Sequence, residues 1–233
     1  MEIKPIARIH SDFPSKFGIP RQSGLVEEVK GRILFEKEYA VAEAFRGLEG
    51  YSHIWLLWEF SEAVRETWSP TVRPPRLGGN TRVGVFATRS PFRPNPLGLS
   101  CVKLEGIEYS KTEGPVLLVS GADLMDQTPI YDIKPYLPLA DCHPEALSGF
   151  AAKTAEHCLQ VELPEECAAY FTEEQQKALL GVLAQDPRPS YQDDPEREYA
   201  MPFAGYDVCF RVNEDRLRVC NVRKLRKQQN ADA

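Results

Sequence analysis

The sequence has no long apolar run and no paired metal-ligand motif. Among its 233 residues, no apolar stretch approaches the roughly 18–20 residues of a membrane-spanning helix, and no signal-peptide core follows the N-terminal lysine. The six cysteines are widely spaced without Cys-x-x-Cys, and the four histidines form neither HExxH nor HxH. We therefore expect free thiols in the cytoplasm, no membrane partner and no metal site.

Three common small-molecule motifs are also missing. No GxGxxG opens a helix after a strand, no GxxxxGK[ST] is present, and no serine lies in GxSxG. These absences argue against a Rossmann nucleotide site, and the phosphate-binding P-loop and the serine nucleophile motif are not present. A ligand site in this chain must therefore be built differently, from loops at strand ends.

Charge is distributed unevenly along the chain. The net charge is −6, yet residues 70–100 contain five arginines and no acid, and residues 216–227 contain six cations and no acid. Such local excess of one sign matters more for partners than the total charge. Both segments are candidates for anion or nucleic-acid contacts, and two solvated faces remain the alternative.

The first part of the chain predicts mainly short strands. Gly- and Pro-rich turns separate apolar segments of strand length, which favours an antiparallel β-barrel or sandwich over alternating βαβ units. The expected strands are residues 4–9, 31–36, 52–60, 81–88, 99–109 and 115–122. One helix is expected at residues 38–50, where alanines and Phe45 recur at helical spacing.

The last part of the chain predicts a smaller α+β unit. Residues 171–185 should form a helix, because Thr172 and Gln175 have capping-box spacing. Residues 206–212 and 217–222 alternate apolar and polar side chains and should form a hairpin that looks separable from the barrel. The expected domains are a barrel at 1–145, a connector at 146–165 and an α+β domain at 166–233.

One short loop has an unusual composition. Residues 88–100 hold three prolines, which stiffen the backbone, and two arginines, Arg89 and Arg93, whose planar forks suit carboxylate or phosphate. Asn95 adds an amide. Residues 123–138 form a second segment of this kind, rich in aspartate, tyrosine and proline, and an ordinary turn followed by a polyproline connector is its alternative reading.

Several segments together resemble one family. They are "PRQSGL", "FRGLEGYSHIWLL", the run at residues 70–100, "DLMDQTPIYDIKPYLP" and "LAQDPRPSY", and they cover nearly the whole chain. The sequence is similar to the S-adenosylmethionine-dependent tRNA (adenine-N6)-methyltransferase family. That resemblance implies a β-barrel enzyme, working as a homodimer, that methylates N6 of threonylcarbamoyladenosine at tRNA position 37.

The resemblance also implies a cofactor site. It assigns S-adenosylmethionine to residues Gln22, Ser23, Gly24, Phe60, Ser61, Arg89, Leu99, Asp126, Gln127, Thr128 and Pro129. Gln127 stands where the family usually has glycine, which argues against a left-handed turn at that position. Ser23 likewise replaces a usual proline.

Catalytic and tRNA-binding residues are expected elsewhere. The target nitrogen must lose a proton, and Asp132, Lys134 and Tyr136 are the groups that we expect to serve it. Arg93 should meet the threonine carboxylate of the modified base, and Asn95 is a further residue expected to contact the substrate or the tRNA. The basic C-terminal segment should bind tRNA phosphates through Arg223, Lys224, Arg226 and Lys227.

Two other readings stay open at this point. The first is a methyltransferase of the same fold that acts on another nucleotide or a small substrate. The second is a barrel that binds S-adenosylmethionine or RNA without catalysis.

Overall fold

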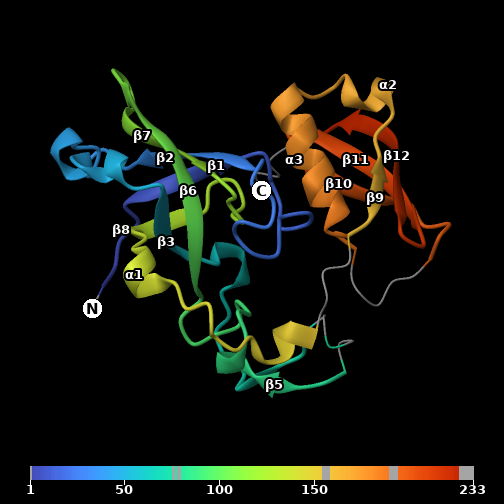
Figure 1. Cartoon of the computed structure of the whole chain (residues 1–233), viewed down its shortest axis with the longest axis horizontal. Coiled ribbons are helices and arrows are strands. Elements are labelled where there is room, and N and C mark those ends of the chain that lie inside the picture. The colour runs from blue at the N-terminus through green and yellow to red at the C-terminus, as the bar shows by residue number, and fades with distance from the viewer. Residues whose placement is uncertain (1, 75–76, 78–79, 154–157, 189–193, 226–233) are drawn as a thin grey trace, which may run out of the picture.

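The computed structural model describes residues 2–74, 77, 80–153, 158–188 and 194–225. Two β units lie beside each other, and a third group of loops lies below the barrel in Figure 1. The strands are β1 Ala7–Ser11, β2 Lys30–Phe35, β3 His53–Glu59, β4 Thr71–Val72, β5 Val83–Gly84, β6 Leu97–Ser110, β7 Gly114–Ser120, β8 Pro129–Pro135, β9 Gln160–Glu162, β10 Tyr199–Phe203, β11 Tyr206–Asn213 and β12 Arg216–Lys224. The α-helices are α1 Pro138–Asp141, α2 Glu165–Ala168 and α3 Glu173–Ala184.

The first unit is a closed antiparallel barrel, as the sequence predicts. Its strand order is β1-β2-β7-β6-β3-β8, and β8 closes the barrel against β1 by pairing Ile130 with Ala7. Along β3, Ile54, Leu56 and Trp58 are buried and alternate with half-exposed residues. This period of two places one side of each strand in the barrel core.

Two expectations for the first unit are wrong. The helix expected at residues 38–50 is replaced by two short 3₁₀ helices, Ala42–Phe45 and Leu48–Gly50. Gly47, with a φ of 88°, separates the two, and Phe45 is their one buried side chain, so little packing stabilises a longer helix. The strand expected at residues 81–88 is shortened to the two residues of β5. Its partner β4 is also only two residues long, and the 3₁₀ helix Val85–Ala87 follows β5 directly.

One barrel strand was read differently from sequence. β8 lies in the segment whose alternative readings were a displayed turn and a polyproline connector, yet it pairs with both β1 and β3. Pro129 is its first residue and Pro135 its last, positions where the missing N–H interrupts the ladder least.

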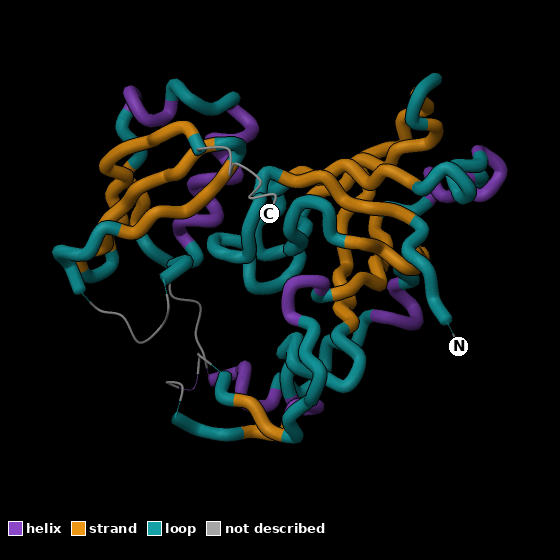
Figure 2. The backbone as a smooth tube through the Cα atoms, turned by 180° about the vertical axis from the view of Figure 1, so that it is seen from behind, coloured by secondary structure: helices purple, strands orange, loops and turns teal. Residues whose placement is uncertain are grey.

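The second unit is a four-stranded sheet covered by α3. The strand order is β10-β11-β12-β9, with β9 parallel to β12. Thr172 and Gln175 form the predicted capping box, and the predicted hairpin is β11–β12. Figure 2 shows this sheet and the barrel from behind as two separate groups of strands joined by loops. Within the described residues, no helix has both the length and the hydropathy that crossing a membrane requires.

The loop between β1 and β2 joins the two units. Three of its side chains, Phe13, Val26 and Val29, are buried in the core of the second unit and not in the barrel core. The Phe13 ring lies 5.3 Å from that of Phe203, edge to face. Gly181 of α3 faces Val26 so closely that an added Cβ would come within 2.6 Å of a Val26 methyl carbon. The second unit is therefore completed by N-terminal residues.

This packing predicts that a substitution in the N-terminal loop strongly lowers the stability of the second unit. Phe13→Ala should lower the free energy of unfolding by about 3–5 kcal/mol, because it leaves a cavity in a fully buried aromatic core. Denaturant titration measures the change. Tyr109→Ala, which removes a ring that is 62% exposed on β6, is the control and should change stability by less than about 0.5 kcal/mol. A Phe13 variant as stable as that control would contradict the shared core.

Candidate functional site

A cavity opens at one end of the barrel. Its volume is about 690 Å³, and its wall comes from the loop before β2, the end of β3 and the segment after it, residues 88–93, the start of β6 and residues 123–128. Cavities of this size enclose nucleotide-sized ligands. The site is thus built from loops at strand ends, as the missing motifs require.

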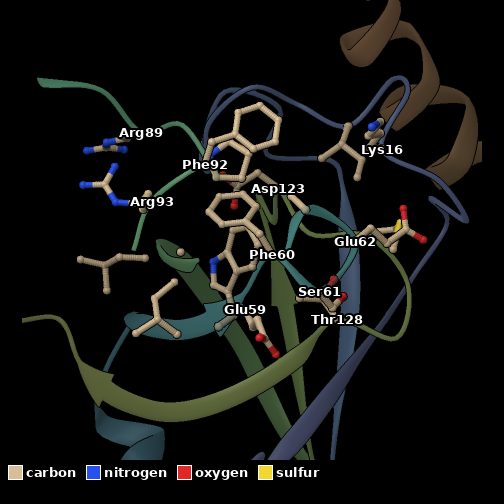
Figure 3. A pocket seen from close by; sticks show the side chains of 18 of the residues that line it. Lys16, Glu59, Phe60, Ser61, Glu62, Arg89, Phe92, Arg93, Asp123 and Thr128 are labelled. Carbon is tan, nitrogen blue, oxygen red and sulfur yellow. The ribbon is translucent and has the colours of Figure 1, made fainter. Parts of the chain in front are cut away.

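Aromatic rings form the inner wall of the cavity. The Trp58 and Phe60 ring centroids lie 4.3 Å apart, and Phe92 lies on the same side in Figure 3. Gly98 on β6 packs directly under Trp58, since an added Cβ would lie 2.3 Å from the indole Cε2. Glycine at this position therefore permits the indole to lie flat against β6.

A chain of hydrogen bonds runs from the barrel core to the cavity. Trp58 Nε1 donates to Ser100 Oγ at 2.9 Å, so the Ser100 hydroxyl hydrogen is free to donate to Asp123 Oδ1 at 2.5 Å. Burial raises the pKa of Asp123, and the Ser100 hydrogen bond opposes that rise. Asp123 thus presents a positioned acceptor to the cavity.

Two arginines occupy one side of the cavity. Figure 3 shows Arg89 and Arg93 next to each other, across the cavity from Lys16 and Glu62. Arg89 Nη1 donates to Gln22 Oε1. Arg93 Nη1 donates to the carbonyl oxygen of Thr88 at 2.7 Å, which fixes the loop that carries both arginines. In the part of the chain described, neither forms an ion pair with a carboxylate, so together they can accept an anionic group.

Most of the predicted cofactor residues meet at this cavity. Its lining includes six of them, Gln22, Phe60, Ser61, Arg89, Leu99 and Thr128, and also Arg93, which is predicted to contact the substrate. Ser23 and Gly24 follow Gln22 and bind the barrel instead. Ser23 Oγ accepts from the Cys101 N–H at 3.2 Å, and the Gly24 N–H donates to the Gly121 carbonyl at 2.9 Å.

The turn at Asp126 lies outside the cavity lining, and so does Pro129. Asp126 Oδ1 accepts from the Ser11 N–H at 3.1 Å and lies 3.6 Å from His10 Nδ1. Gln127 has a φ of 65°, so the argument against a left-handed turn at this glutamine is wrong. Hydrogen bonds to β1, including one between Gln127 Nε2 and His10, hold the turn in that conformation.

The predicted catalytic residues lie on the outer wall of the barrel, Asp132 and Lys134 on β8 and Tyr136 directly after it. Lys134 Nζ pairs with Asp132 Oδ2 at 2.9 Å, and the Tyr136 ring lies 5.7 Å from that of Trp55. Asp132, Lys134 and Tyr136 are not among the described residues that line the cavity. Two residues of β3 link them to the cavity. Trp55 lines the cavity and pairs with Lys134, and Leu57 pairs with Asp132 on one side and with Leu99 at the cavity on the other.

The predicted tRNA-binding residues are spread over two surfaces. Asn95 is exposed in the loop that carries Arg93. Arg223 and Lys224 are exposed at the end of β12, with Arg223 Nη2 3.8 Å from Glu198. Arg226 and Lys227 lie outside the described residues.

Sequence reasoning did not identify Asp123, or the side chains of Ser100 and Trp58 that form the hydrogen-bond chain to it. Asp123 stands three residues before Asp126 in the segment already considered, and only the barrel register shows which carboxylate faces the cavity. A signal was available for Ser100, because Gly98, Ser100, Val102 and Leu104 alternate along an inward-facing strand. A serine in such a series needs a buried partner.

Comparisons with known proteins agree over both units. The model of the tRNA-methyltransferase O N-terminal domain matches residues 8–142, and that of the TrmO C-terminal domain matches residues 156–225. A tRNA (adenine(37)-N6)-methyltransferase of Escherichia coli K12 is 42% identical, covering 91% of this chain and 94% of the relative. A Pseudomonas aeruginosa relative, 41% identical over 94% of this chain and 96% of its own, is named for S-adenosylmethionine-dependent methyl transfer.

Solved structures are similar over the whole length as well. The crystal structure of TrmO from Pseudomonas aeruginosa superposes with a TM-score of 0.78 at 35% identity and covers 97% of each chain. The fold and the cavity define a β-barrel protein with a nucleotide-sized ligand site at the end of the barrel. More particularly, the chain belongs to the tRNA-methyltransferase O family.

The hydrogen-bond chain yields a pH-dependent prediction. Ser100→Ala should cost about 1–3 kcal/mol of stability at about pH 7. The pKa of Asp123 is higher in the folded state than in the unfolded state. The free energy of unfolding therefore falls as the pH rises from the unfolded-state pKa to the folded-state pKa of this carboxyl group. Loss of the Ser100 donor raises the folded pKa further. The difference from wild type should therefore be smaller at about pH 5, where the folded carboxyl group is more protonated.

Ser120→Ala is the matched control for this experiment. Ser120 is equally buried and donates to Glu105, whose pKa is lowered to about 2 by Ser120 and by Lys30 and Lys103. The two lysines keep Glu105 ionised, so the control should lose nearly the same stability at both pH values. Denaturant titrations at the two pH values measure both variants. A Ser100 variant with no pH dependence would contradict the assigned donor.

Proposed function

We propose that this protein transfers a methyl group from S-adenosylmethionine to N6 of adenosine 37 in tRNA, with N6-threonylcarbamoyladenosine as the substrate form. The observation that carries the proposal is that segments of residues 16–128, all within the N-terminal family match, build a single cavity. A tRNA (adenine(37)-N6)-methyltransferase is also 42% identical along nearly the whole chain. The enzyme would act in the cytoplasm.

The cavity suits the parts of S-adenosylmethionine. The rings of Trp58 and Phe60 offer an apolar surface to adenine, and so does the face of Phe92 that the Arg65 guanidinium, 3.6 Å from the ring centre, does not cover. Asp123 can accept from the ribose hydroxyls or the amino group, and Arg89 can donate to the carboxylate. When bound, S-adenosylmethionine supplies an electrophilic methyl group on its sulfonium. The protein's own part is mainly to position that group against the incoming base.

The modified base adds a carboxylate of its own. Arg93 lies beside Arg89 at the cavity and carries no carboxylate partner among the described residues, so it is our choice for the threonine carboxylate. The N6 lone pair is delocalised into the ring and the carbamoyl group, and its proton must leave. Asp132, with Lys134 and Tyr136 nearby, is the proposed group for that step.

A homodimer would reconcile the positions of these residues. Asp132 and Lys134 lie on an outer barrel wall that reaches the cavity edge at Leu99, whose side chain is 56% exposed. In a two-fold dimer this wall of one copy can face the arginine loop of the other, so that each site draws on both copies. Arg223 and Lys224, with Arg226 and Lys227 beyond the described residues, would bind tRNA phosphates.

The division of the chain follows from the same proposal. The barrel at 1–145 would bind the cofactor, residues 146–165 would connect the parts, and residues 166–233 would serve tRNA binding. The loop between β1 and β2 contributes to both the cavity and the second core, so the second unit also supports the cofactor site.

The test is an incubation with labelled S-adenosylmethionine and tRNA carrying or lacking the threonylcarbamoyl group, followed by digestion to nucleosides. Labelled N6-methyl-threonylcarbamoyladenosine from the modified tRNA alone is expected. Label in a different nucleoside would reassign the substrate, and cofactor binding without any product would indicate a non-catalytic barrel.

Arg89→Ala should weaken S-adenosylmethionine binding about 10- to 100-fold, because a charge-assisted hydrogen bond contributes about 1.5–3 kcal/mol. Titration calorimetry measures this affinity. Arg73→Ala, an exposed arginine outside the cavity lining, is the control and should bind the cofactor as wild type does. Equal affinities of the two variants would contradict the role of Arg89.

Mixing two inactive variants tests the shared site. Arg89→Ala and Asp132→Asn should each lose turnover, and a mixture that exchanges subunits should regain about a quarter of the wild-type activity per site if each site uses Arg89 of one copy and Asp132 of the other. Sedimentation should show a dimer. A fully active monomer, or a dimer without any recovery, would overturn this arrangement.

A further inference from the structure

Two aromatic rings are exposed beside the cavity. Trp68 is 50% exposed and Phe86 is 72% exposed, and their rings are nearly parallel, with centroids 6.1 Å apart and planes inclined by 29°. Neither ring contributes to the two buried cores. Exposed aromatic surface of this kind lowers solubility, so a stacked pair of rings on the surface indicates a binding site for a ligand or a partner molecule.

The backbone beneath the rings is held in place. β4 pairs with β5, and the Val85 N–H donates to the Pro70 carbonyl at 2.9 Å. Val85 is buried while its neighbour Phe86 points to solvent. The segments that carry the two rings are therefore tied together, and the rings form a preorganised platform, defined here as Trp68 and Phe86.

Cations lie on the segments that carry the platform, and Glu66, two residues before Trp68, is the exposed acid nearest to it in the sequence. The Arg93 guanidinium lies 5.9 Å from the centre of the Phe86 ring, and Arg82 Nη1 donates to Thr71 Oγ1 at 2.6 Å. Arg73 is exposed on the same stretch, and the sequence has no acid between residues 70 and 100. An occupant with aromatic faces and negative charge complements both features, and unpaired nucleotides have both.

We propose that the platform stacks an unpaired base of the tRNA anticodon loop next to the base that enters the cavity. The inference rests on the proposed function. A base must leave its stack to reach an enclosed site, and its neighbours then lose a stacking partner. Arg93 links the two places, because it lines the cavity and also lies over Phe86. Aromatic rings next to cations are the usual receptors for such unstacked bases.

A second copy of the chain is the competing occupant. A contact of this surface with itself across a two-fold axis would bring Arg73, Arg82 and Arg93 of both copies together, with Glu66 as the one exposed acid next to Trp68 in the sequence. Such like-charge contacts are costly at an interface. RNA therefore fits the surface better.

The test compares Trp68→Ala and Phe86→Ala with wild type, using an anticodon stem–loop RNA that carries threonylcarbamoyladenosine. Each variant should bind this RNA about 5- to 100-fold more weakly, because stacking contributes about 1–3 kcal/mol per base. Affinity for S-adenosylmethionine should not change. Trp68→Phe and Phe86→Tyr should restore most RNA binding, since they keep a ring. Tyr109→Ala, at an exposed ring far along β6, is the control and should bind as wild type does.

Salt dependence separates stacking from charge. The alanine variants should keep the wild-type slope of log affinity against log salt, whereas Arg82→Gln should reduce it by about 0.7–0.9, the value for one phosphate contact. Unchanged RNA affinity in both alanine variants would overturn the platform. A loss of RNA binding that follows only a change from dimer to monomer in sedimentation would also overturn it, in favour of a second copy.

Wild-type turnover in the same preparation distinguishes two failures. If wild type methylates the stem–loop but the alanine variants bind it normally, the platform is wrong and the proposed function stands. If wild type binds neither the stem–loop nor S-adenosylmethionine, the proposed function fails and the platform fails with it.

Discussion

The burial of Phe13, Val26 and Val29 in the second core is the constraint on which the candidate site depends. These residues belong to the loop between β1 and β2, which also lines the cavity through Gln22. A loop held by its apolar side chains on one unit can present polar groups to the other at little entropic cost. The barrel holds this loop by hydrogen bonds, such as those of Ser23 and Gly24, and the second core adds the burial of its apolar side chains. The two units therefore form one functional structure although they have separate sheets.

Asp123 and the two loop arginines lie on different sides of the cavity. Asp123 is held from the barrel side by Ser100 and Trp58, whereas Arg89 and Arg93 come from a proline-stiffened loop on another side. A ligand with a cationic centre and a carboxylate can therefore be oriented by fixed groups of opposite charge. S-adenosylmethionine has both.

Two local signals in the sequence predicted the structure correctly, one local signal failed, and the long-range contacts were not predicted. The capping box at Thr172 and the β11–β12 hairpin depend on neighbours in the chain, and both form as predicted. The helix expected at residues 38–50 failed because Gly47 and sparse burial outweigh its helical spacing. The choice of Asp126 over Asp123, and the core position of Phe13, depend on strand register and on packing between distant segments, which spacing does not encode.

Scanning calorimetry with and without S-adenosylmethionine tests the central claim, that both cores support one cofactor cavity. The account predicts a single unfolding transition for the whole chain, which saturating cofactor shifts to higher temperature as one unit, because binding to the folded state stabilises everything that unfolds with the site. Two transitions, of which the cofactor shifts only the barrel's, would contradict the account and leave the C-terminal unit as an independent attachment.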